Sequence, residues 1–375
     1  MRSVSWCAAV LAASCLAVAA PGCAGDSTSD ADLDDALGAE VAGGEAESSE
    51  DALTTREISA YAPIAPPEHR VTTEAIRSRV GPACAPGRKL AVIRTATFEG
   101  EAARLVVDEE SFATSLVPAL ALDRGSRSAS AADHVQDTRW SRSLADLSRR
   151  GVALDRLSAD APSLGADEPF ALTVDMCQSR KPWERRLFEW AVTLSGRIGE
   201  PVPVGIAMTG VWARAHPGEL DELMAWEQSG KLAITWINHS STHPLHCLDA
   251  ACRRAEFLTA ASVDFDQEVL DEERTILARG MAPSALFRFP GLVHDAHRLG
   301  QLARLSMMPL DADAWIAKGQ PIKARAVVLV HGNGNEPEGI TGFLRQVETP
   351  ARAAALASGR TKLVSPLFVA PTPPR

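Results

Sequence analysis

Residues 167–375 alternate between short apolar runs and longer segments in which apolar residues recur every three or four positions. The short runs have the length and composition of β-strands, and the longer segments have the period of amphipathic helices. We expect strands at residues 170–174, 202–208, 232–237, 285–289 and 326–330, with weaker candidates at 306–310 and 362–369. We expect helices at residues 182–197, 217–229, 264–279 and 296–305. This alternation predicts βαβ units with parallel strands, and six or seven units predict an α/β domain of the distorted or incomplete (β/α) barrel type.

Residues 61–166 have a weaker pattern and form an N-terminal extension without an assigned fold. Residues 61–86 are rich in proline and irregular, whereas residues 89–94 and 104–108 have the character of strands. Residues 113–166 mix serine, arginine, aspartate and alanine without a clear period, so no element is predicted there.

The first residues have the pattern of an export signal. Arg2 supplies a positive charge, and residues 8–20 form an apolar run that is too short for a transmembrane helix. The sequence of residues 20–23, APGC, resembles a bacterial lipoprotein box, whose cysteine becomes the lipidated first residue. We therefore predict a signal peptide of residues 1–22, lipidation of Cys23, and an exported protein anchored to a membrane by its lipid alone, in the periplasm or at the cell surface. Ordinary signal cleavage without lipidation is the alternative.

Residues 23–60 have the composition of a disordered acidic tether. Between residues 24 and 57 there are eleven Asp or Glu residues and one arginine, in a background of Ala, Gly, Ser and Thr. Such a segment cannot bury enough apolar surface to fold. Its formal charge of −10 equals that of the whole chain, so the rest is nearly neutral. A nearly neutral folded part argues against a nucleic-acid partner.

Four of the seven cysteines lie beyond the predicted signal and lipidation site: Cys84, Cys177, Cys247 and Cys252. An even number in an oxidising compartment allows three disulfide pairings. The closeness of Cys247 and Cys252 in the sequence favours a local disulfide over a zinc site.

Two histidines follow the strand expected at residues 232–237. His239 and His243 lie four residues apart, and one helical turn after the strand would put them on the same face, where both could bind one cation. Alone, such a pair is more often a set of polar residues at a helix start.

Other reactive side chains also follow the expected strands: Asp175, Arg288, Asp311, Asp313 and His331. The carboxyl ends of parallel strands share one edge of the sheet, and active sites are built there. We therefore expect these residues to meet in one site, although more than 150 positions separate the first from the last.

Five segments in this order resemble the motifs of polysaccharide deacetylases, the NodB-homology enzymes of carbohydrate esterase family 4. They are LTVD at 172–175, HSSTHP at 239–244, RFPG at 288–291, DADAW at 311–315 and VLVH at 328–331. The resemblance covers roughly residues 170–340, and HSSTHP is its most specific part.

The resemblance implies a metal-dependent hydrolase. His239 and His243 would bind a divalent metal, which in this family is usually zinc, and Asp175 would be the general base. His331 would be the acid that protonates the leaving amine or alcohol, and Arg288 would orient Asp175.

The resemblance also implies positions around the substrate. Asp311 or Asp313 would support His331, and we favour Asp313. Trp315 and Pro290 would line the sugar site.

The chain departs from the family pattern at the aspartate that, with the two histidines, binds the metal in that family. The family has two adjacent aspartates in its first motif, and Met176 stands in place of the second. A thioether is a poor zinc ligand, so Asp175, Cys177, Asp264 or water would have to complete the site. The third motif also lacks its aromatic residue before Gly291, and Ala314 replaces an aspartate in the fourth.

Some of these residues have simpler interpretations. Asp175 could cap a helix, Arg288 could belong to a structural ion pair, and Met176 is a packing residue. His294 and His297 match no motif and are assigned to the surface of a helix start.

The sequence therefore supports three functional hypotheses. The first is a carbohydrate deacetylase that removes N- or O-acetyl groups from an acetylated polysaccharide of the envelope or the extracellular space. The second is a glycan-binding protein of the same fold whose catalysis is impaired by Met176, and the third is an envelope scaffold. An α/β-hydrolase is excluded, because the HGNGNE segment at 331–336 has no accompanying G-x-S-x-G motif.

Overall fold

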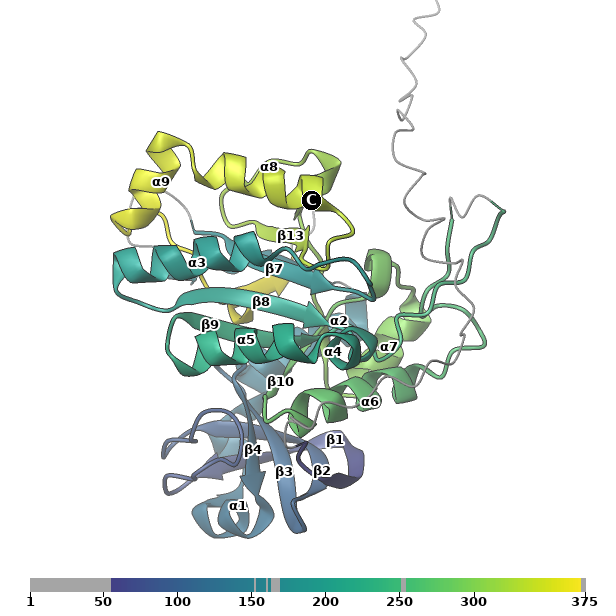
Figure 1. Cartoon of the computed structure of the whole chain (residues 1–375). Coiled ribbons are helices and arrows are strands. Elements are labelled where there is room, and N and C mark those ends of the chain that lie inside the picture. The colour runs from purple at the N-terminus through teal and green to yellow at the C-terminus, as the bar shows by residue number, and fades with distance from the viewer. Residues whose placement is uncertain (1–54, 152, 160, 163–168, 251–253, 372–375) are drawn as a thin grey trace, which may run out of the picture. The chain divides into compact units, whose positions relative to one another are not determined.

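The computed structural model describes residues 55–151, 153–159, 161–162, 169–250 and 254–371 (Figure 1). The predicted signal peptide, Cys23, Cys252 and nearly all of the acidic tether lie outside the described residues. None of the helices in the described ranges combines the length and apolar character that crossing a bilayer requires.

A seven-stranded parallel sheet confirms the expected fold class. Its order is β11-β10-β9-β8-β7-β13-β12. The bounds are β7 (Ala171–Met176), β8 (Val202–Met208), β9 (Leu232–Asn238), β10 (Pro283–Phe287), β11 (Met308–Pro309), β12 (Ala314–Trp315) and β13 (Val327–His331). The edge strands β11 and β12 are not paired with each other in the described residues, so the barrel is incomplete.

The helices expected between the strands are present. They are α3 (Arg185–Ile198), α5 (Pro217–Gln228), α6 (Phe265–Ala278) and α7 (Ala296–Arg304). Four further elements of this region were not predicted: α4 (Gly210–Ala215), α8 (Pro337–Val347), α9 (Pro350–Ala357) and β12. Figure 1 shows α3 and α5 lying along β8 and β9.

Strand alternation separates the two faces of β7. Leu172, Val174 and Met176 belong to the core shared with α3 and α8, whereas Ala171 belongs to the core on the other face. Thr173 and Asp175 point to the same face as Ala171, and both contact Arg288 there. The polar residues of β7 therefore face the interior of the half-barrel.

The N-terminal extension forms a five-stranded antiparallel sheet, ordered β4-β3-β2-β1-β5. Its strands are β1 (Ile58–Thr72), β2 (Lys89–Phe98), β3 (Glu101–Asp108), β4 (Thr114–Pro118) and β5 (Ser126–Ser128). The prediction that residues 61–86 are irregular was wrong for β1. This strand accommodates its prolines through register shifts between Ser59 and Ala62 and between Pro63 and Glu68.

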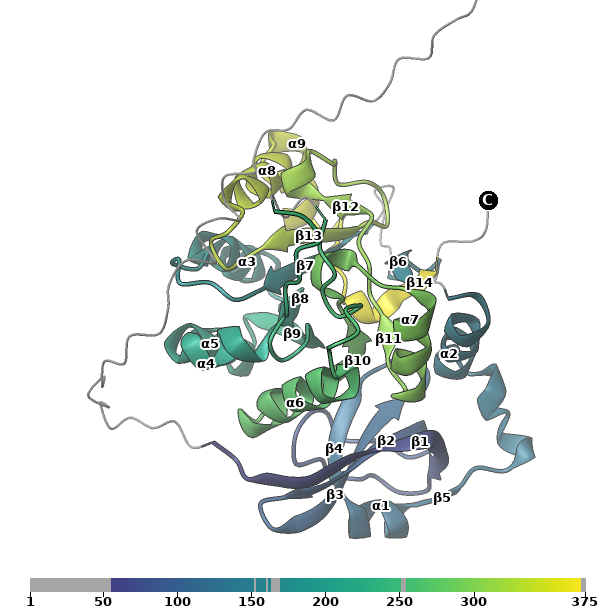
Figure 2. The ribbon, with the colours of Figure 1, turned by 90° about the vertical axis from the view of Figure 1, so that its right-hand side faces the viewer.

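Residues 113–166, which had no predicted element, also contain α1 (Ala119–Gly125), α2 (Arg139–Arg150) and β6 (Leu154–Leu157). Strand β6 pairs with β14 (Val369–Pro371) in a separate two-stranded sheet, seen in Figure 2. The strand expected at 362–369 was wrong, because this segment has one bridge, Phe170 to Leu363, and a 3-10 turn, η6 (Pro366–Phe368).

A buried ion pair joins the N-terminal sheet to α6. Arg94 of β2 and Glu273 of α6 are 0% and 1% exposed at their side chains, and Nε lies 2.8 Å from Oε2. Tyr61 of β1 donates its hydroxyl to the same carboxylate at 3.0 Å.

Candidate metal and acid–base site

The carboxyl ends of β7, β9, β10 and β13 bring four of the predicted residues together. Asp175 and His331 are register partners on β7 and β13. His239 directly follows β9, and Arg288 directly follows β10. The expectation that residues far apart in the sequence meet at this edge is therefore met by the architecture.

Asp175 and Arg288 form a buried ion pair. Nη1 of Arg288 lies 3.0 Å from Oδ1 of Asp175, while its other nitrogens donate to Thr173 Oγ1 at 3.0 Å and to the Leu310 carbonyl at 2.7 Å. Burial alone would raise the pKa of Asp175, but the positive charge of Arg288 beside it holds the pKa below its ordinary value. Asp175 is thus a carboxylate whose orientation Arg288 fixes.

His239 is held in one tautomer by the backbone. Its Nδ1 lies 2.8 Å from the carbonyl oxygen of Arg288, which can only accept, so Nδ1 carries the proton. Nε2 then faces Asp175 Oδ2 at 3.7 Å and Cys177 Sγ at 3.4 Å. Burial lowers the pKa of His239, which favours the neutral imidazole that a metal requires.

The loop from His239 to His243 is not a helical turn, and that prediction was wrong. Ser240 and His243 have positive φ values of 68° and 51°, which an α-helix excludes. Glu268 of α6 holds the loop by accepting from the backbone N–H groups of Ser241 and Thr242. The two imidazoles nevertheless meet, with ring centroids 4.9 Å apart. Backbone strain of this kind is concentrated at functional sites.

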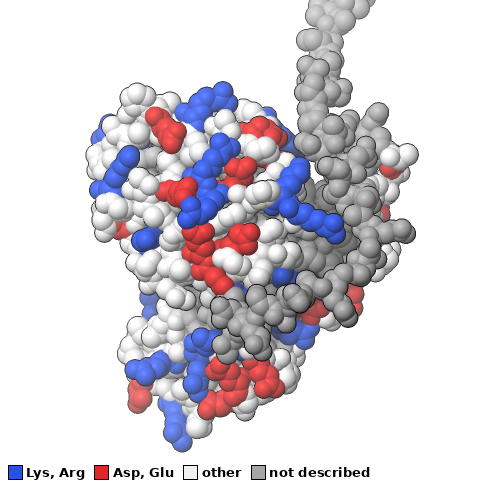
Figure 3. Space-filling view, in the orientation of Figure 1, with Lys and Arg blue, Asp and Glu red and all other residues white. Residues whose placement is uncertain are grey.

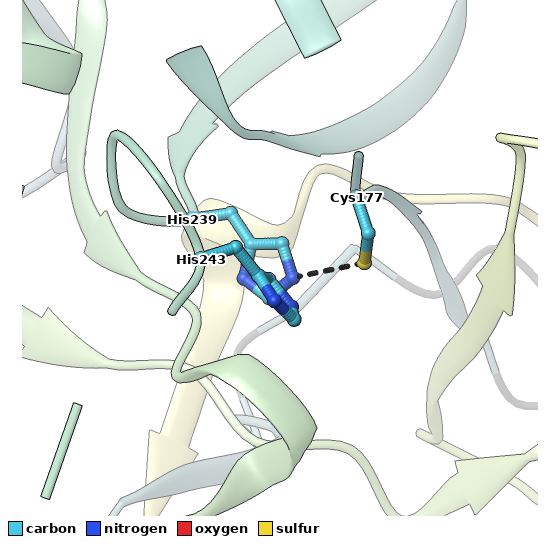
Figure 4. A group of neighbouring side chains, drawn as sticks. All are labelled: Cys177, His239 and His243. Carbon is cyan, nitrogen blue, oxygen red and sulfur yellow. Dashed lines mark hydrogen bonds between the residues drawn. The ribbon is translucent and has the colours of Figure 1, made fainter. Parts of the chain in front are cut away.

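Cys177 completes a cluster of three donors with the two histidines (Figure 4). One ligand atom from each of Cys177, His239 and His243 lies within 4.8 Å of the others, and all three residues are buried. Nδ1 of His243 is buried without a hydrogen-bond partner in the described part of the chain. Burial raises the pKa of the Cys177 thiol, but His243 and His331 outweigh burial and lower the pKa to about 7.

The cysteines behave differently from one another. Cys84 and Cys177 are free thiols. Cys247 is disulfide-bonded, and its expected partner, Cys252, lies outside the described residues.

His331 is supported by Glu336, a residue that the motifs did not indicate. Glu336 Oε2 lies 2.6 Å from His331 Nδ1 and accepts the indole N–H of Trp315 at 3.1 Å. Burial disfavours the imidazolium, but the Cys177 thiol and the Glu336 carboxylate raise the pKa of His331 well above its usual range. His331 is therefore held as a protonated acid.

The predicted support of His331 by Asp311 or Asp313 is not what the structure shows. Asp313 accepts the backbone N–H of Val327 at 2.8 Å, and burial raises its pKa. Asp311 lies 3.2 Å from His294 Nε2, so His294 is also more than a surface residue. Within the described residues, neither aspartate has a hydrogen bond to His331.

The remaining predicted residues occupy different positions. Trp315 lies beside His331, with ring centroids 5.7 Å apart, and Pro290 is buried at the start of the turn that follows Arg288. Asp264 caps α6 by accepting from Gln267 N at 3.1 Å and is outside the donor cluster.

Two asparagines join the loops after β7 and β13. Asn333 Nδ2 donates to the Cys177 carbonyl at 3.2 Å, and Asn335 Nδ2 donates to the Gln178 carbonyl at 3.3 Å. The polar segment 331–336 was the sequence signal for both asparagines and for Glu336. From the sequence alone, this segment was interpreted only as a possible α/β-hydrolase motif.

The exposed side of the site is the side of His331. The side chains of His331 and Glu336 are 14% and 29% exposed, whereas those of His239 and Asp175 are 1% and 4% exposed. Among these four side chains, solvent therefore reaches mainly those of His331 and Glu336.

No protein-family model matches the chain. Among solved structures, it is similar to a family 4 carbohydrate esterase from Bacillus anthracis, with 15% identity over 59% of this chain and 88% of the other and a TM-score of 0.40. It is similar to PdaA of Bacillus subtilis, a family 4 carbohydrate esterase, with 16% identity over 59% and 86% and a TM-score of 0.38. It is also similar to a family 4 pseudoenzyme from Bacillus anthracis, with 15% identity over 53% of this chain and 68% of the other and a TM-score of 0.34. Values this low carry no conclusion about activity.

Proposed function

We propose that this protein is an exported, metal-dependent hydrolase that removes acetyl groups from a polysaccharide. The observation that carries the proposal is the donor cluster of Cys177, His239 and His243, with Asp175 on one side and His331 on the other. A general base, an acid and a candidate metal site thus meet at one sheet edge.

The donors fit a divalent metal such as zinc. Imidazole nitrogens and cysteine thiolates are typical zinc donors. Within the described residues Nδ1 of His243 has no hydrogen-bond partner, so the cluster is not closed by internal hydrogen bonds. When bound, the metal would supply a Lewis acid that polarises an acetyl carbonyl.

Asp175 and His331 have the opposite protonation states that acid–base catalysis needs. Arg288 keeps Asp175 ionised, so its carboxylate can accept a proton from water. Glu336 holds Nδ1 of His331, which leaves Nε2 to deliver a proton to the departing amine or alcohol. Such a pair, pushed apart in pKa by its surroundings, is the arrangement expected of a base and an acid.

The substrate class and the location are supported by the sequence. The ordered motifs resemble those of polysaccharide deacetylases, and Trp315 presents an aromatic ring beside His331. The signal-like residues 1–22 and the box before Cys23 support export and a lipid anchor.

The test is the metal content of a protein beginning near residue 55, beside a His239→Ala/His243→Ala variant. We expect about one equivalent of zinc in the parent and none in the variant. His297→Ala, which changes an exposed histidine on α7, should keep the metal.

Activity is then measured as acetate released from N-acetylated chitooligosaccharides and from O-acetylated xylan. We expect Asp175→Asn and His331→Ala to lower the rate by about 10²–10⁴-fold, the usual contribution of acid–base catalysis. A parent that binds no metal, even after reconstitution, would refute the metallohydrolase mechanism.

Met176 favours a second candidate function, glycan binding without catalysis, because no carboxylate stands at that position. It predicts glycan capture that survives the loss of His239 and His243, with no acetate release. A scaffold role predicts no affinity for glycans.

A further inference from the structure

Met176 cannot act as a ligand, because it points away from the two histidines. Its side chain is fully buried in the core shared with α3 and α8. A Cβ added to Gly332 would lie 2.6 Å from the Met176 sulfur, so this sulfur packs directly against the loop after β13. The position that carries a metal aspartate in the resembled family is therefore a packing position here.

Cys177 follows Asp175 by two residues and returns to its side of the strand. Its Sγ lies 3.4 Å from Nε2 of His239, the nitrogen that the Arg288 carbonyl leaves free. Figure 4 shows the thiol directed at the two imidazoles. The Cys177 carbonyl accepts from Asn333, which fixes the backbone behind the thiol.

We propose that Cys177 is the third protein ligand of the metal and binds it as a thiolate, replacing the carboxylate of the resembled family. This inference rests on the proposed function. Binding forms a metal–sulfur bond and releases the thiol proton to solvent.

The spacing of the donors suits this assignment. Zinc–sulfur and zinc–nitrogen bonds of about 2.3 Å and 2.0–2.1 Å at a tetrahedral angle put sulfur and nitrogen roughly 3.6 Å apart. The observed separation of Sγ and Nε2 is 3.4 Å. With two nitrogens and one sulfur, the fourth position stays open for water or substrate, as in catalytic zinc sites.

A thiolate ligand changes which metals the site prefers. Sulfur donors select soft or borderline ions such as zinc, whereas carboxylates suit magnesium and manganese. We therefore expect zinc, cobalt and cadmium to bind, and magnesium and manganese to compete poorly. A thiolate ligand also makes the site sensitive to oxidation.

The test is cobalt substitution of the metal-free protein. Cobalt(II) bound to a thiolate absorbs in the near ultraviolet through sulfur-to-metal charge transfer, and we expect this band at one equivalent. Cys177→Asp should bind cobalt without the band, and Cys177→Ser should lose the band. Cys84→Ser removes the second free thiol of the described residues and should leave the band unchanged.

The possible outcomes separate the two proposals. Cobalt that binds through His239 and His243 without the band overturns the ligand role of Cys177 and leaves the metal mechanism standing. A protein that takes up neither cobalt nor zinc overturns both. Cys177→Asp keeps the test valid where Cys177→Ser fails to fold, because a carboxylate can still bind the metal.

Discussion

At the residue scale, the site depends on charged groups that are held in matched pairs, one pair buried and the other partly exposed. Asp175 has Arg288, and His331 has Glu336. A buried charge without a partner is costly, so each pair also decides whether its members keep their charge. The protonation states of Asp175 and His331 thus depend on the partners that packing at the strand ends gives them.

Arg288 provides the first test of this dependence. Arg288→Met leaves the Asp175 carboxylate buried without its partner, and we expect a loss of about 3–5 kcal/mol in the free energy of unfolding. The measurement is urea-induced unfolding at pH 7. Arg185→Met, which removes an exposed arginine that pairs with Glu222, should change little. If both variants lose the same free energy of unfolding, the buried Asp175–Arg288 pair contributes no more to stability than the exposed pair does.

Glu272 gives a prediction about pH. This carboxyl of α6 is fully buried, and neither of its oxygens has a hydrogen-bond partner in the described residues. Burial raises its pKa well above the ordinary value of 4.5. The folded state therefore binds this proton more tightly than the unfolded state does. The contribution of the protonated carboxyl to the free energy of unfolding is fully present below the pKa of Glu272 in the unfolded chain, and it is lost as the pH rises through the pKa in the folded protein.

We therefore expect Glu272→Gln to be more stable than the parent by an amount that grows between pH 5 and pH 8. Unfolding in urea at several pH values measures this difference. Glu338→Gln, at an exposed position on α8, is the matched control for the substitution itself. A pH-independent effect of Glu272→Gln would show that the carboxyl is already ionised in the folded protein.

At the scale of elements, the loops after β7 and β13 act together. Asn333 and Asn335 donate to carbonyls of the β7 loop, and Gly332 N donates to the Asp175 carbonyl at 3.0 Å. The thiol of Cys177 and the ring of His331 are therefore positioned by one hydrogen-bonded unit. Groups that orient metal ligands in this way affect affinity without touching the metal.

Asn333→Ala removes the bond to Cys177 and should weaken zinc binding by about 10–100-fold. Competition with a chelator of known affinity measures the change. The matched control is Ser148→Ala on α2, whose exposed hydroxyl bonds only within its own helix. Unchanged zinc affinity in Asn333→Ala would show that the loop is positioned by other contacts.

Strand periodicity predicted the elements that have strong apolar patterns and missed those that lack them. The bounds of β8 were predicted as residues 202–208. In contrast, β11 was only a weak candidate within residues 306–310 and β12 was not predicted, because each has only two residues and gives no period. The loop after β9 was mispredicted as a helical turn, because positive φ values at Ser240 and His243 depend on contacts with α6. Glu336 was not predicted, because its role depends on its contacts with the rings of His331 and Trp315. The spacing of residues in the sequence does not predict such contacts.

At the scale of the whole molecule, the N-terminal sheet belongs to the same core as the half-barrel. Phe98 and Leu105 of this sheet share a hydrophobic cluster with Ile237 and Val327 of the parallel strands. The sequence predicted β2 and β3 but did not establish that their sheet shares a hydrophobic core with the half-barrel. The complete five-stranded sheet was not predicted, because β1 contains prolines and register shifts and the residues after 113 have no clear apolar period.

The ion pair between Arg94 and Glu273 allows this union to be measured. Arg94→Met or Glu273→Leu alone leaves a buried charge unpaired, and each should lower the free energy of unfolding by about 3–5 kcal/mol. The double variant removes both charges, so its loss should be smaller than the sum of the single losses.

Unfolding in urea should also remain a single transition in the parent protein. Tyr61, the one tyrosine of the chain, reports on the N-terminal sheet, and tryptophan fluorescence, to which six residues from Trp183 onward contribute, reports mainly on the half-barrel. Coincident curves are expected, because the two sheets share a core and a buried ion pair. If the tyrosine and tryptophan unfolding curves no longer coincide in Arg94→Met or Glu273→Leu, the ion pair is required for the two sheets to unfold together. If the parent curves already differ, the N-terminal sheet is an independent folding unit, and the cost of Arg94→Met should then appear in the tyrosine signal alone.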